Sequence, residues 1–227
     1  MAPVTPREAA TVILLRDGPS GLETWLLRRV AQMSFAAGMS VFPGGGVDPV
    51  DSDGARSQTE AAVAAQLEVS AEHAATLLRT AAREVAEETD VRLPLEAIHP
   101  WARWITPEAE PRRYDTYFFV AVIPEGGVAT AVTGEASHAD WIPVSQALAE
   151  YEQGSRPMVP PTVLNLIEVA GLGTAAQVLA TAGSRPVRPI MPVLRKLADD
   201  SWVAELGDGT QVPLPAGFIT VSGKTLP

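Results

Sequence analysis

The sequence predicts an α/β (α+β) fold, in which helices flank a mixed β-sheet and a β-hairpin follows near the C-terminus. Three observations support this prediction. Short runs rich in β-branched and aromatic residues, such as 10–16 and 114–123, are typical of strands. Residues 71–89 repeat apolar side chains at three- and four-residue spacing, as an amphipathic helix does. Strands and helices do not alternate strictly along the chain, which favours a mixed sheet.

The first part of the chain predicts a hairpin followed by an irregular loop. The apolar run 10–16 ends in the turn sequence "DGPSG", and a second strand is expected at 23–30. After a short strand at 39–42, seven glycines and prolines fall between residues 38 and 54. Loops of this kind on a rigid scaffold often carry functional residues.

The remaining elements follow from local signals. Ser70 is a favourable N-cap for the helix at 71–89, and a shorter helix is expected at 59–67. Later strands are expected at 97–105, 114–123 and 140–144, and later helices at 145–153 and 162–179, the second after "PP". Residues 185–192 are interrupted by prolines. Two alternating runs around "GDG" at 207–209 predict the C-terminal hairpin.

Composition narrows the classes of partner. The formal net charge is −10, from 17 basic and 27 acidic residues, which argues against a nucleic-acid backbone or an anionic membrane as the main partner. The absence of cysteine excludes disulfides, thiolate metal sites and cysteine nucleophiles. The N-terminus lacks a basic segment before its apolar run, and no apolar run approaches the roughly 20 residues that span a bilayer. We therefore expect a cytoplasmic protein that acts on small molecules.

Three carboxylates cluster near the end of the predicted helix. Glu84, Glu87 and Glu88 lie at i, i+3 and i+4, a spacing at which like charges slightly destabilise a helix. In an acidic protein such a run is most often a solvated face. Arg83 beside it, and the preceding loop "FPGGGVD", favour a cation site instead, because hard ions such as Mg²⁺ prefer oxygen ligands. Removing Glu87 or Glu88 is expected to leave the stability of the metal-free protein unchanged or slightly raised.

The segments "PGGGVDPVD" and "REVAEETDV" together resemble the Nudix box, G-x5-E-x7-R-E-U-x-E-E-x-G-U, where U is apolar. The second half matches at Arg83, Glu84, Val85, Glu87, Glu88 and Val91. The first half departs: with Gly45 as the box glycine, the acidic position falls on Asp51, and 31 residues (52–82) precede Arg83 where the pattern has seven. Asp90 replaces the second glycine, and aspartate tolerates a left-handed conformation.

One branch of this family, the mitochondrial and peroxisomal coenzyme A diphosphatases, carries an insertion at this point. The sequence is similar to that branch also in "LLRRVAQMSFAAGMSVFPGGGVDPVD", "WITPEAEPRRYDTYFFVAVI" and "MVPPTVLNL". The resemblance implies a Nudix-like α/β/α sandwich at residues 1–182, with the insertion at about 52–78. A C-terminal extension with the hairpin would then occupy 183–227.

The implied activity is hydrolysis of a diphosphate bond in a nucleoside diphosphate linked to another group, dependent on Mg²⁺ or Mn²⁺. The branch favours coenzyme A or acyl-CoA as substrate. ADP-ribose, dinucleotide polyphosphates and nucleoside triphosphates remain alternatives, as does a non-catalytic Nudix-like module that binds a nucleotide. A homodimer is compatible with the family.

The resemblance also implies roles for individual residues. Glu84, Glu87 and Glu88, with the backbone carbonyl of Gly45, would bind the metal, and Arg83 would orient a box glutamate. The general base would be Glu84 or Glu135, the latter in a segment whose alternative is a solvated loop. Arg28, Arg112 and Arg113 would contact substrate phosphates, unless they are ordinary surface arginines, and Gly44 would lie against the substrate. Asp48 is expected to hold the glycine loop, and Asp51 either to do the same or to take the acidic role of the box.

Overall fold

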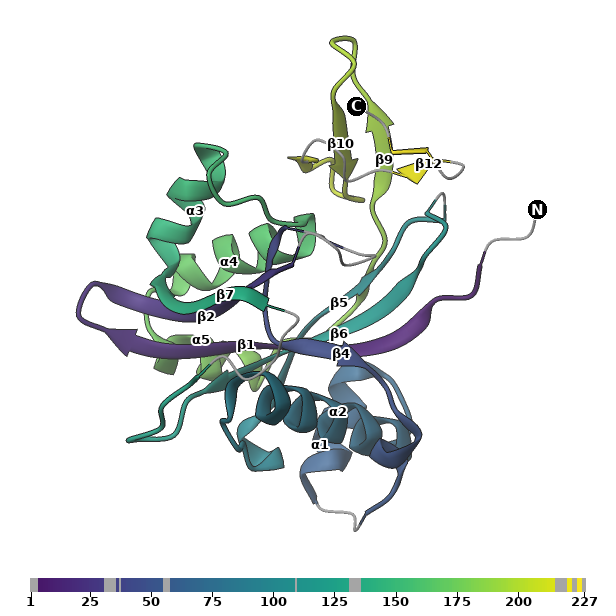
Figure 1. Ribbon diagram of the computed structural model, residues 1–227. Helices are drawn as coiled ribbons and strands as arrows, with labels where there is room; N and C mark the ends of the chain where they lie inside the picture. The colour runs from purple at the N-terminus through teal and green to yellow at the C-terminus, as the bar shows by residue number, and fades with distance from the viewer. Residues whose placement is uncertain are drawn as a thin grey trace.

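The computed structural model describes residues 4–30, 36, 38–54, 58–108, 110–130, 136–214, 220–221 and 224–225. Its centre is a mixed β-sheet covered by helices on both faces (Figure 1). The predicted α/β fold with a mixed sheet is therefore confirmed.

The main sheet contains β1 (Arg7–Gly18), β2 (Gly21–Arg29), β3 (Ser40–Val41), β4 (Gly44–Gly46), β5 (His99–Ile105), β6 (Tyr114–Val122), β7 (Ala136–Pro143) and β8 (Pro189–Ile190). Its strand order is β3-β2-β1-β6-β5-β8, with β4 paired to β1 and β7 paired to β2. The β1–β6 and β5–β8 pairs are parallel, and the other pairs are antiparallel.

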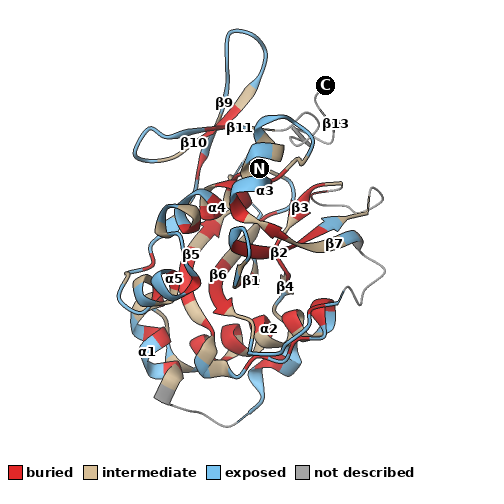
Figure 2. Cartoon of the chain, turned by 90° about the vertical axis from the view of Figure 1, so that its left-hand side faces the viewer, coloured by how far each residue is buried: buried red, intermediate tan, exposed pale blue. Residues whose placement is uncertain are grey.

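The helices are α1 (Gln58–Leu67), α2 (Ala71–Thr89), α3 (Val144–Glu152), α4 (Pro160–Leu172) and α5 (Ala175–Ala182), with short 3₁₀ turns at Pro49–Ser52 and Leu95–Ala97. Alternation along the central strands assigns the core to two layers. In β1, Val12 and Leu14 pack toward α1 and α2, whereas Ile13 and Leu15 pack toward α3, α4 and α5. Figure 2 shows buried residues, in red, along the central strands and on parts of the helices that cover them.

Helix α2 begins and ends where the sequence predicted. The Ser70 hydroxyl accepts a hydrogen bond from the backbone N–H of His73 at 3.1 Å, which satisfies one of the first amides of the helix. At the other end Asp90 has φ 60°, the left-handed conformation that ends a helix. Asp90 therefore performs the task of the glycine in the family pattern.

Several predicted elements needed correction. The helix expected at 162–179 is two helices, because Gly173, with φ 82°, ends α4 and Thr174 caps α5. Helix α4 also begins two residues earlier than expected, since proline fits the first turn. The loop glycines 44–46 form strand β4, whose pairing with β1 is too distant in sequence to be predicted locally.

The C-terminal hairpin is confirmed and belongs to a three-stranded sheet, β9 (Val193–Lys196), β10 (Trp202–Glu205) and β11 (Gln211–Pro213). A two-stranded pair, β12 (Thr220–Val221) and β13 (Lys224–Thr225), follows. Figure 1 shows the three-stranded sheet at the top, far from α1 and α2. The Tyr151 hydroxyl of α3 donates to the Pro213 carbonyl at 3.1 Å, which ties the small sheet to the body.

Within the described part of the chain, no single helix is long and apolar enough to cross a membrane. Helices α4 and α5 meet the length and composition criteria only together, and the chain bends by 109° between them.

Candidate active site

Asp51 and Arg83 meet in space although 31 residues separate them. Two hydrogen bonds join the guanidinium to the carboxylate, from Nε at 2.9 Å and from Nη2 at 3.0 Å. The intervening segment folds as α1 and the first half of α2, which pack against each other and return the chain to the same point. Of the two roles proposed for Asp51, the acidic position of the box agrees with this geometry.

The Asp51 carboxylate also organises the loop after the glycines. It accepts further hydrogen bonds from the Thr80 hydroxyl and the Asp48 backbone N–H, both at 2.9 Å. Asp48 in turn caps the 3₁₀ turn, which is the loop-holding role expected for it. Burial alone would raise the pKa of Asp51, but the bonds from Arg83, Asp48 and Thr80 outweigh it and hold the pKa below its ordinary value.

The glycine strand β4 lies directly against α2. The backbone N–H of Gly44 donates to Glu88 at 2.9 Å, and a Cβ at Gly45 would collide with the carboxylate of Glu84. A side chain at Gly45 would therefore push the Glu84 carboxylate out of its observed position. Arg83 completes the arrangement by donating to the Gly46 carbonyl at 3.1 Å.

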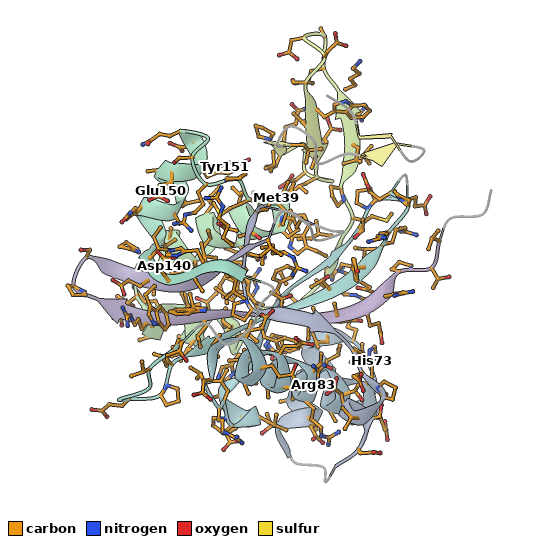
Figure 3. The ribbon with its side chains drawn as sticks, in the orientation of Figure 1. Met39, His73, Arg83, Asp140, Glu150 and Tyr151 are labelled. Atoms are coloured by element: carbon orange, nitrogen blue, oxygen red, sulfur yellow. The ribbon has the colours of Figure 1, made fainter. Side chains whose placement is uncertain are left out.

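The three glutamates differ in their surroundings. Glu84 is largely buried, and this burial raises its pKa despite a 2.7 Å bond from Arg83. Glu88 is 8% exposed, whereas the Glu87 side chain is 57% exposed and 3.3 Å from Arg83. Figure 3 shows Arg83 on α2, on the lower side of the sheet. Arg83 thus donates hydrogen bonds to both Glu84 and Glu87.

All three glutamates line a cleft of about 1020 Å³. Its acidic end is formed by these carboxylates and the glycines of β4. The rest of the lining is mainly apolar and comes from the segment 39–42, the ends of β5 and β6, the start of α4, and the small C-terminal sheet. A cleft of this volume accommodates a ligand of nucleotide size.

The donor set at the acidic end suits a hard divalent cation. Glu84 and Glu88 flank the bare backbone of Gly45, and Glu84 is desolvated, so an adjacent positive charge would favour its ionised form. Among the described residues, no group of three acidic or histidine side chains is already placed to hold an ion, and the Glu87 carboxylate is paired with Arg83 at 3.3 Å. Glu84, Glu88 and the Gly45 carbonyl are therefore the residues that fit an ion best.

The residues predicted to contact substrate have different positions. Arg112 lines the cleft, as does Gly44, although the Gly44 N–H is bonded to Glu88. Arg28 instead lines a separate hollow of about 460 Å³. Arg113 is buried, and its guanidinium donates to the carbonyls of Val4 at 2.8 Å and Thr106 at 3.0 Å. It therefore links the N-terminal segment to the loop after β5.

Other lining residues were missed in the sequence. Arg29 lines the cleft, where Arg28 was expected. Alternation along the strand could have distinguished the two, because neighbouring side chains project to opposite faces of the sheet. Leu194, Ala204 and Leu214 reach the cleft from the C-terminal sheet, and no local pattern reveals this. Glu135, the alternative base, lies outside the described residues.

Comparison with known proteins identifies the family of the domain that carries this cleft. Residues 5–161 match the NUDIX domain family. A NUDIX hydrolase from Alicyclobacillus acidocaldarius superposes with a TM-score of 0.66 at 24% identity, over 82% of this chain and 99% of that one. The NUDIX domain of Shewanella oneidensis NrtR, solved with ADP ribose, gives 0.53 at 15% identity, over 74% and 88%. No curated protein was found to match the chain. The chain therefore belongs to the NUDIX domain family.

Proposed function

We propose that this protein hydrolyses the diphosphate bond of a nucleoside diphosphate linked to a second group, with Mg²⁺ or Mn²⁺ at its acidic end. The observation that carries the proposal is the close approach of Gly45 to Glu84, with Glu88 bonded to the adjacent Gly44 N–H. NUDIX hydrolases as a group use divalent metal ions. Such an ion, held by Glu84, Glu88 and the Gly45 carbonyl with Glu87 at the rim, would neutralise diphosphate charge and acidify water.

The chain's own residues would divide the remaining work. Arg83 fixes the carboxylate of Glu84 at 2.7 Å, so that this group keeps one orientation while substrate binds. Asp51 fixes Arg83 in turn. Arg112 would supply positive charge to the substrate phosphates from the opposite lining, and Arg29 joins it in that role. The base that takes a proton from the attacking water is Glu84 or Glu135.

Coenzyme A and acyl-CoA remain the favoured substrates, on the branch resemblance and on the apolar lining beyond the acidic end. ADP-ribose is the second candidate, because the NrtR domain of similar fold was solved with that molecule. The insertion resembles that of the coenzyme A branch, and the Asp51–Arg83 bonds join the chain on its two sides.

The test is a hydrolysis assay with coenzyme A, ADP-ribose and a dinucleotide polyphosphate, with Mg²⁺ and with chelator. Wild type should turn over at least one substrate only with the ion, and Glu88→Gln should lose at least tenfold in kcat. Glu125→Gln, at an exposed turn after β6, is the control and should match wild type. Full activity of Glu88→Gln would refute the site, and inactivity of wild type on every diphosphate would favour the nucleotide-binding module.

A further inference from the structure

The C-terminal sheet forms one wall of the cleft that holds the acidic site. Leu194 and Ala204 are direct partners across β9 and β10, so their side chains share one face of the small sheet. Both line the cleft, together with Leu214 just after β11. The neighbouring Val193 projects from the other face and is 56% exposed. The small sheet therefore presents one particular face to the cleft.

The body supplies a second apolar wall to the same cleft. Met39 and Val159, together with Ala36, form a small buried apolar cluster, and Pro160 continues the lining at the start of α4. Figure 3 places Met39 and Tyr151 on the part of the body nearest the small sheet. The hydrogen bond from Tyr151 to Pro213 fixes the sheet there. Two apolar walls thus belong to one cleft.

The acidic end and this apolar part come from opposite sides of the main sheet. Glu84 and Glu88 belong to α2, which covers the lower face, whereas the small sheet lies at the top (Figure 1). A ligand with its diphosphate beside the glutamates would extend toward Leu194 and Met39. Burying apolar surface is favourable, and burying a polar group without partners is costly. The portion of ligand held between the two walls should therefore be apolar.

We propose that the C-terminal three-stranded sheet selects substrates that carry an apolar arm beyond the diphosphate, with Leu194 and Leu214 as the residues that contact it. This inference rests on the proposed function, because the assay reads out the same diphosphatase site. It assigns a task to the C-terminal extension, which lies beyond the residues that match the NUDIX domain.

The test compares two ligands and two neighbouring substitutions. Hexanoyl-CoA carries an apolar hexanoyl group at the end of its pantetheine arm. ADP-ribose carries an adenosine diphosphate without the 3′-phosphate of coenzyme A and without an apolar arm. Leu194→Gln should lower kcat/KM for hexanoyl-CoA at least tenfold and change that for ADP-ribose less than twofold, since an amide there lacks partners. Val193→Gln, on the opposite face, should change neither value. If Leu194→Gln fails to fold, Leu214→Gln provides the same comparison.

Equal losses on both substrates, or equal effects of Val193→Gln and Leu194→Gln, would overturn the proposal. Calorimetric binding of both ligands separates it from the proposed function. If wild type hydrolyses none of the diphosphates tested, the dinucleotide polyphosphate included, but Leu194→Gln still weakens hexanoyl-CoA binding at least tenfold, the diphosphatase proposal fails and the proposed role of the C-terminal sheet stands. If wild type hydrolyses ADP-ribose but Leu194→Gln binds hexanoyl-CoA as tightly as wild type does, the proposed role of the C-terminal sheet fails and the diphosphatase proposal stands.

Discussion

The Asp51–Arg83 pair should stabilise the fold, and Asp51→Asn tests this directly. The substitution keeps the shape of the side chain but replaces an acceptor oxygen by a donor amide. Asp51 is 3% exposed and accepts hydrogen bonds from Arg83, Thr80 and the Asp48 backbone, so the new amide would face donors. Hydrogen bonds to charged groups contribute about 1.5–3 kcal/mol each.

The decrease in the free energy of unfolding expected for Asp51→Asn can be estimated from the burial of the pair. Removing one partner of a buried ion pair costs about 3–5 kcal/mol. Arg83 is 23% exposed and keeps Glu84 as a partner, which places the value at the lower end, about 3 kcal/mol. For a chain of this size the midpoint of thermal unfolding should fall by about 6–12 °C.

Urea unfolding followed by tryptophan fluorescence measures this difference, with an unchanged slope m showing that the same surface is exposed. Asp53→Asn is the matched control, because Asp53 is exposed two residues further along the same loop. The control should stay within about 0.5 kcal/mol of wild type. A loss below about 1 kcal/mol for Asp51→Asn would refute the argument that this pair closes the two halves of the site.

Further predictions follow from the same structure. The pKa of Asp51 is lower in the folded state, so the stability that its carboxylate contributes is complete above the unfolded pKa of about 3.9 and is lost as the pH falls through the lower folded value. The difference in the free energy of unfolding between wild type and Asp51→Asn, measured in urea, should therefore be constant from pH 5 to 7 and disappear in stronger acid. Glu88→Ala should lower the free energy of unfolding by about 1–2 kcal/mol, because the Gly44 N–H loses its acceptor. Glu87→Ala, in the same helix, should change it by less than about 0.5 kcal/mol. Equal effects would refute the argument that the buried Glu88 contributes more to stability than the exposed Glu87. Gly45→Ala should weaken Mn²⁺ binding, measured by electron paramagnetic resonance, by displacing Glu84. Gly46→Ala should not, because a Cβ there makes only an ordinary contact with the Glu8 carbonyl oxygen at 3.9 Å. Gly173→Ala, at φ 82°, should cost about 1 kcal/mol, whereas Gly171→Ala inside α4 should be neutral or stabilising; a reversed order in thermal unfolding would show that the helix break is not set by Gly173.

The sequence predicted what local chemistry decides. Helix α2 was predicted to the residue because Ser70 and Asp90 end it through their own side chain and backbone conformation. The different environments of Glu87 and Glu88 could not be predicted, because Glu88 accepts a hydrogen bond from a residue 44 positions away in the sequence. Removal of either residue was expected to leave the stability of the metal-free protein unchanged or slightly raised, and the bond from the Gly44 N–H revises this expectation for Glu88. Arg112 and Arg113 are adjacent in sequence, yet only the fold shows that one lines the cleft and the other is buried.

The insertion shows how the spacing between two halves of a motif can change while the two halves still meet in space. Lengthening a flexible connection from seven to 31 residues is about two doublings, at about 0.6 kcal/mol each, so the entropic cost is near 1.2 kcal/mol. The Asp51–Arg83 pair offsets more than that. The described part of the insertion is also held by side-chain contacts. Arg79 of α2 donates to the Asp51 carbonyl at 3.3 Å and lies 3.4 Å from the Glu60 carboxylate, so it links α2 both to Asp51 and to α1. What the site requires is therefore that Asp51, Gly45 and Glu84 meet in space, and a folded α1–α2 segment meets that requirement as well as a seven-residue link does.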